Sequence, residues 1–76
     1  METGLDCLRV GQLGSVLEIN TDRYLRCRLQ AFGLIPGTQV CCRYRTPGGS
    51  VTALEVSGTV IALRTRDMQK IRVRCL

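Results

Sequence analysis

Histidine and tryptophan are absent from this 76-residue sequence. Histidine is the commonest general base near neutral pH and the commonest metal ligand, so its absence removes the usual centre of acid–base catalysis and of metal binding. A phosphate-binding loop of the type G-x-x-x-x-G-K and a C-x-x-C pair are also missing. The carboxylates stand singly, without the close pairing that divides acid and base roles, at Glu2, Asp6, Glu18, Asp22, Glu55 and Asp67. We therefore expect that the protein is not an enzyme and holds no cofactor.

The sequence also has no long hydrophobic run. Its strongest apolar stretch in the C-terminal half, residues 60–63, is far shorter than the roughly 20 residues of a membrane helix. The N-terminus carries Glu2 and Asp6 and lacks the basic start and apolar run of a secretory signal. These features predict a soluble, cytoplasmic protein without membrane insertion. A chain this short builds one small core, so we expect a single domain over residues 1–76, with its core at about residues 8–75, that functions through its surface.

Aromatic residues make up only 4% of the chain, namely Tyr24, Phe32 and Tyr44. Periodicity places Phe32 and Tyr44 on core faces, which leaves little for the stacking of bases in a nucleic-acid site. The net charge of +5, nearly all of it from arginine, nevertheless favours acidic partners. We expect no stable nucleic-acid complex, but a basic nucleic-acid-binding barrel stays an alternative function. Its phosphate contacts would come from outward strand faces, at Arg43, Arg45, Arg72 and Arg74.

The five cysteines are an odd number, which argues against a disulfide framework. In a reducing compartment we expect most of them to be small buried hydrophobes. Cys41 and Cys42 are adjacent in a strand and therefore point to opposite faces, which does not suit a joint chelating or disulfide role. A metal or thiol sensor would have to use cysteines far apart in sequence, with Cys7, Cys27 and Cys75 as the candidates for transient ferrous iron or zinc.

Short apolar segments separated by turn residues predict a small, mainly β domain. Five strands are expected at about residues 15–20, 38–45, 51–56, 59–63 and 71–75, with a helical turn at about 66–69. Between the first two strands, the pattern is that of a helix capped by Thr21 or Asp22 and ended by Gly33. Its apolar stripe comprises Leu25, Leu29 and Phe32. Short antiparallel strands in so few residues protect their edges by closing, which predicts an SH3-like or OB-like barrel with one packed helix.

A run of the pattern R-L-x-x-x-G-L-x-P-G-T extends from Arg28 to Thr38. Further motif residues flank it, namely Gly11, Gly14, Val16, Val40 and the segment Val60-Ile61-Ala62-Leu63-Arg64. This arrangement resembles the FeoA family over about residues 8–73, and the run is the most specific part of the resemblance. That family comprises small cytosolic proteins associated with bacterial ferrous iron transport. The resemblance implies an SH3-like barrel of about five antiparallel strands with one short α-helix packed against it.

The resemblance also implies a partner, the cytosolic GTPase domain of a FeoB-type membrane permease, whose nucleotide turnover or assembly the chain would regulate. The same fold looks like the C-terminal domain of iron-dependent repressors, so a metal-responsive regulatory domain is a further alternative. Exposed strand edges also leave self-association into a homo-oligomer open.

Two roles are expected for the motif residues and their neighbours. Turn chemistry assigns structural roles to Gly33, Pro36, Gly37 and Gly58. Exposed arginines are favoured at interfaces, which makes Arg26 and Arg28 candidates for partner contact. Leu34 is a further candidate because we expect it on an exposed corner beyond the helix. Leu29 is expected to pack on the barrel, with partner contact as its alternative role.

Overall fold

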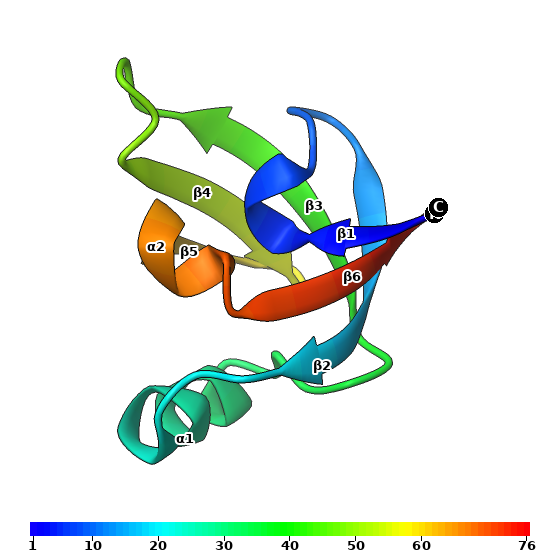
Figure 1. Cartoon of the computed structure of the whole chain (residues 1–76), viewed down its shortest axis with the longest axis vertical. Coiled ribbons are helices and arrows are strands. Elements are labelled where there is room, and N and C mark those ends of the chain that lie inside the picture. The colour runs from blue at the N-terminus through cyan, green and yellow to red at the C-terminus, as the bar shows by residue number, and fades with distance from the viewer.

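The computed structural model describes residues 1–76 as one six-stranded antiparallel sheet with two α-helices and a 3-10 helix. In chain order the elements are β1 (Glu2–Gly4), η1 (Leu5–Cys7), β2 (Leu13–Ile19), α1 (Arg23–Ala31), β3 (Gln39–Arg45), β4 (Val51–Val56), β5 (Thr59–Arg64), α2 (Thr65–Met68) and β6 (Ile71–Cys75). The strand order is β1-β6-β2-β3-β4-β5, and the sheet curls into a barrel with α1 outside the curl (Figure 1). The mainly β barrel is therefore confirmed. None of its helices has the length and apolar character needed to cross a membrane.

Sequence reasoning missed the N-terminal strand, so the sheet has six strands and not five. β1 pairs with β6, and the backbone N–H of Cys75 donates to the carbonyl of Met1 at 2.8 Å. The two ends of the chain consequently lie together (Figure 1). None of the three residues of β1 is buried, so its sequence carries no apolar alternation that could reveal it.

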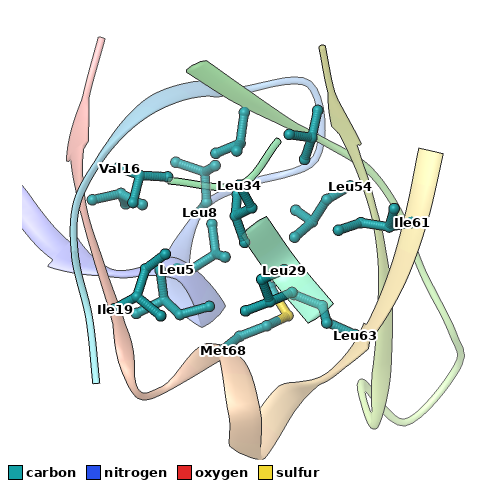
Figure 2. Packing of buried hydrophobic residues seen from close by; sticks show 14 of the residues in the cluster. Leu5, Leu8, Val16, Ile19, Leu29, Leu34, Leu54, Ile61, Leu63 and Met68 are labelled. Atoms are coloured by element: carbon teal, nitrogen blue, oxygen red, sulfur yellow. The ribbon is translucent and has the colours of Figure 1, made fainter. Parts of the chain in front are cut away.

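A single hydrophobic core fills the barrel. Its 15 buried residues come from the inner strand faces and also from the helices and the N-terminal segment. Figure 2 shows Leu29 of α1 and Met68 of α2 pointing into the same interior as the strand residues Ile61 and Leu63. Helix α1 therefore covers the barrel through Leu29, as its apolar stripe predicts.

A bulge in β3 changes which side chains face outward. The register between β3 and β4 shifts between Cys42 and Tyr44. The bulge adds one residue to β3, so the side chains after it point to the opposite face of the sheet from the one that simple alternation predicts. Tyr44 is 59% exposed, so its predicted place in the core is wrong. Arg45 instead turns inward, where its guanidinium donates to the carbonyl of Asp6 at 2.8 Å and to that of Leu8.

The N-terminus of α1 agrees with the predicted cap. The side chain of Asp22 accepts from the N–H of Leu25 at 2.8 Å, which satisfies one of the unpaired amides of the first turn. The C-terminal end departs from the prediction at Phe32, which is the C-cap and is 45% exposed. Because the helix ends at Ala31, the apolar periodicity no longer applies at that position.

The chain reverses direction at Gly33, whose φ of 87° is in the left-handed region. The N–H of Leu34 then donates to the carbonyl of Leu29 at 2.9 Å. This turn directs the Leu34 side chain back into the barrel, where it is 0% exposed. The prediction that Leu34 lies on an exposed corner is therefore wrong.

The predicted turn glycines do occupy turns. Ser57 and Gly58 both have positive φ, 51° and 80°, and form the two-residue connection between β4 and β5. Gly37 has a φ of 94° and follows Pro36 in the turn that leads into β3, where its N–H donates to the carbonyl of Val16 at 2.7 Å. These residues give the chain its direction changes around α1 and β5.

A candidate interaction surface around helix α1

Helix α1 separates two grooves on the surface. The first, here called the β2 groove, lies between α1 and β2, has a volume of about 580 Å³ and includes Arg26, Leu17 and Ile35 in its wall. The second, here called the β5 groove, lies between α1 and β5, has a volume of about 140 Å³ and includes Arg28, Phe32 and Ala62. The helix therefore presents different side chains to each side.

The two arginines predicted for partner contact lie on opposite sides of α1. Arg26 lines the β2 groove and Arg28 lines the β5 groove. Two positions along a helix correspond to roughly 200° of rotation, so their side chains diverge. Both are exposed, as predicted, but a partner that fills one groove would contact only one of them.

An exposed aromatic side chain stands between the grooves. Tyr24 is 74% exposed, and the guanidinium of Arg28 lies 5.9 Å from the centroid of its ring. At that distance the cation is attracted by the ring, which holds Arg28 near the tyrosine. Sequence reasoning did not single out Tyr24 as a contact residue, although its place off the apolar stripe of the helix was a signal for exposure.

The remaining predicted contact residues lie beneath this surface. Leu29 is 2% exposed and Leu34 is 0% exposed, so both pack in the core and position α1 from below. The exposed apolar residues here are Phe32 and Ile35, which flank the turn at the C-terminal end of α1. The burial of Leu29 agrees with its expected packing on the barrel, and the exposed apolar side chains of this segment are those of Phe32 and Ile35.

Charge on this surface is mostly positive. The β2 groove includes Arg23 and Arg26 from α1, with Glu18 of β2 facing them. In the β5 groove, Arg28 and Arg64 share the wall with Asp67. Each groove therefore has two cations and one carboxylate, which suits an acidic partner.

The cysteines belong to no cluster of three or more potential metal ligands. No group of three or more histidine, cysteine, aspartate or glutamate side chains comes together, so Cys7, Cys27 and Cys75 stay separate. Cys7 and Cys27 are exposed, contrary to the expectation that most of the cysteines are buried, whereas Cys41 and Cys42 are buried. All five thiols are free.

The arginines predicted as phosphate contacts are largely engaged within the chain. Arg43 bonds to Glu55, which raises the pKa of the guanidinium first through that hydrogen bond and then through the negative charge. Arg74 lies 3.5 Å from a carboxylate oxygen of Glu2, and Arg45 donates to backbone carbonyls. Arg72 alone of the four makes no such contact. Three of the four arginines that the nucleic-acid alternative would use are therefore in contact with other groups of the chain.

Comparison with known proteins finds one matching family model and several similar solved structures. The model of the FeoA domain family matches residues 3–75. A crystal structure described as the iron uptake regulatory protein FeoA superposes with a TM-score of 0.87 and 26% sequence identity, with each chain covered over its full length. No curated protein matches the chain.

A second structure identifies the barrel type. FeoA of Stenotrophomonas maltophilia, solved with zinc and described as an SH3 domain protein and a candidate activating factor of ferrous iron transport, matches with a TM-score of 0.77 and 23% identity. That match covers 93% of this chain and 88% of the other. The SH3-like fold predicted from the sequence is thereby confirmed.

The same fold occurs within a larger regulator. A manganese-dependent transcriptional repressor matches with a TM-score of 0.86 at 18% identity, covering 99% of this chain and 42% of the repressor. At that identity the likeness extends to the fold alone, as expected from the predicted resemblance to repressor C-terminal domains.

Proposed function

Because the chain belongs to the FeoA family, a family of accessory domains of ferrous iron transport, we propose that it is an adaptor for the cytosolic GTPase domain of a FeoB-type permease. The observation that carries this proposal is the exposed outer surface of α1, with Tyr24 and Arg28 toward one side and Arg26 toward the β2 groove on the other. The proposal places the chain in the cytoplasm, because the GTPase domain of the permease is cytosolic. Binding there would let the chain regulate nucleotide turnover or assembly of the permease.

The chemistry of this face suits a protein partner with acidic side chains. Tyrosine and arginine are enriched at the energetic centres of interfaces, where they combine a large contact area with directed hydrogen bonds. Arg26 can reach a partner carboxylate with two parallel N–H groups. The overall charge of +5 also accelerates encounter with an acidic surface.

The β2 groove is the larger of the two hollows beside α1 and provides room for a partner side chain or loop. Leu17 and Ile35 supply apolar area in its wall, and Arg26 lies at its side. An apolar anchor surrounded by polar residues is the usual anatomy of a protein interface. We therefore assign the permease contact to α1 and the β2 groove.

The test is a binding titration between this chain and the purified GTPase domain of the permease from the same genome. Reversing both helix arginines, Arg26→Glu with Arg28→Glu, should abolish binding, and the single variants assign it to one groove. We expect Arg26→Glu to weaken binding at least about tenfold, because a charge reversal at a contact turns attraction into repulsion. Arg9→Glu is the matched control, since Arg9 is exposed and lies before β2, at the end opposite α1.

Unchanged affinity of a folded Arg26→Glu, Arg28→Glu variant would refute the assignment to α1. Failure of the unmodified chain to bind the GTPase domain would refute the partnership itself. Binding of nucleic acid to the purified chain, lost on nuclease treatment, would instead support the basic-barrel alternative.

A further inference from the structure

The last strand of the sheet has an unpaired edge. β5 pairs only with β4 and is therefore terminal in the strand order. On the side of β4 that faces β3, the N–H of Val51 donates to the hydroxyl of Thr46, and the carbonyl of Val51 accepts from the N–H and the hydroxyl of Thr46. The backbone groups of Val51 therefore point away from its partner in β5, Arg64, so this pair has no hydrogen bonds between the two strands. Pairs with and without such bonds alternate along an antiparallel ladder, so Ala53–Ala62 and Glu55–Val60 also have none. The N–H and carbonyl groups of Val60 and Ala62 therefore face the free edge. Arg64 offers only its N–H there, because it is the N-cap of α2 and its carbonyl accepts the first bond of that helix.

This edge has little of the usual protection against another strand. Natural edge strands carry prolines, charged side chains or bulges that prevent further pairing. β5 contains no proline, its one charged residue is Arg64 at its C-terminal end, and its register with β4 runs without a bulge from Thr59 to Arg64. All three residues that face the edge are exposed, Val60 to 60%. The edge is therefore accessible to another extended chain.

The β5 groove lies along the same strand. Leu25 of α1 and the C-cap residue Phe32 line one of its sides, and residues Ile61–Arg64 of β5 line the other. In an added strand, every second side chain would point toward α1 and the others would lie on the outer face beside Ala62. A chain with apolar residues at alternate positions would thus place them in the groove while its backbone completes the edge.

We propose that the free edge of β5 and the β5 groove bind an extended acidic peptide segment of a partner protein, which adds to the sheet as a seventh strand. Main-chain hydrogen bonds to Val60, to Ala62 and to the N–H of Arg64 supply the affinity, and alternate apolar side chains pack beside Phe32, as in other cases of strand addition. Acidic residues between them lie near Arg28 and Arg64. This proposal does not depend on the permease partnership.

Charge selects an acidic segment over a second copy of this chain. Two copies, each with a net charge of +5, would repel, and edge-to-edge pairing would bring Arg64 of each copy close to the other edge. Asp67 offsets only one of the two cations in the groove. An acidic chain instead gains attraction from both arginines.

The test uses the peptide acetyl-EVEVEVE-amide as the probe and the full isotope-labelled chain. We expect the backbone amide resonances of Val60, Ala62 and Arg64 to shift on titration, and hydrogen exchange at Ala62 to slow at least about tenfold at saturation. Two control peptides carry N-methyl groups, one on every valine and one on every glutamate. Only one of these two control peptides should lose binding, because in an added strand either the valine amides or the glutamate amides face β5, and not both.

A pair of variants tests the edge without changing charge. Ala62→Pro removes the outward N–H and fills the edge, yet it breaks no ladder bond, so the fold should persist. Ala62→Val is the matched control, because it adds similar bulk and keeps the N–H. We expect Ala62→Pro to weaken peptide binding at least about tenfold, as for the loss of one or more hydrogen bonds, and Ala62→Val to bind nearly as the parent chain.

Three outcomes would overturn the proposal. The first is that neither shifts nor exchange protection occur along β5 at millimolar peptide. The second is that a folded Ala62→Pro chain and both N-methylated peptides bind as their parents do, which would mean simple charge attraction. The third is protection of β5 amides that rises with protein concentration without peptide, which would identify the occupant as a second copy. The permease titration is unaffected by each of these outcomes, so the two proposals fail separately.

Discussion

Replacing Arg45 with methionine should destabilise the protein far more than the same change at Arg43. Simple alternation along a strand places both side chains outward, but the bulge of β3 turns Arg45 inward. There its guanidinium donates to the carbonyls of Asp6 and Leu8 and so ties the N-terminal segment to β3. Methionine keeps an unbranched stem of similar length and removes the donors.

The expected magnitude follows from those two bonds. Hydrogen bonds from a charged donor contribute about 1.5–3 kcal/mol each. Burial of Nε of Arg45, which has no partner, offsets about 1–3 kcal/mol of that gain. We therefore expect Arg45→Met to lower the free energy of unfolding by about 2 kcal/mol. For a domain of this size the melting temperature should fall by roughly 8–16 °C.

The assay is thermal and urea unfolding followed by circular dichroism, with Arg43→Met as the control. Arg43 is exposed and bonds to Glu55 in an ion pair of the surface type, which contributes little to stability. Equal effects of the two substitutions, or no measurable effect of Arg45→Met, would refute the inward placement of Arg45. An intermediate effect confined to the N-terminal segment in hydrogen exchange would show local rather than global unfolding.

Three further predictions concern the segment that ends α1 and the thiols. Leu34→Ala should lower the free energy of unfolding by about 2–5 kcal/mol and Ile35→Ala much less, because Leu34 alone is buried; equal effects in urea unfolding would contradict the turn. Gly33→Ala should destabilise by about 1–2 kcal/mol, since its φ of 87° disfavours a Cβ, and a neutral result in the same assay would argue against that conformation. Thiol-specific reagents should modify Cys7 and Cys27 in the folded protein and reach the adjacent cysteines of β3 only on unfolding; labelling of all sites at one rate would oppose this.

The candidate surface was predictable only in part. Exposure of Arg26 and Arg28 follows from helical periodicity, since both lie off the apolar stripe. Their separation into two grooves depends on where β2 and β5 lie on either side of the helix. No local pattern carries that information, because it arises from contacts between segments far apart in the chain.

The sequence by itself determined the positions of β2 to β6, a helix cap at Thr21 or Asp22, the turn at Gly33 and the family motif, because each depends on neighbouring residues and their intrinsic backbone preferences. Only the tertiary structure decided three other features. The bulge in β3 comes from pairing with β4, and it reverses Tyr44 and Arg45. β1 exists because β6 is there to pair with it. The free edge of β5 results from the strand order, which long-range pairing alone establishes.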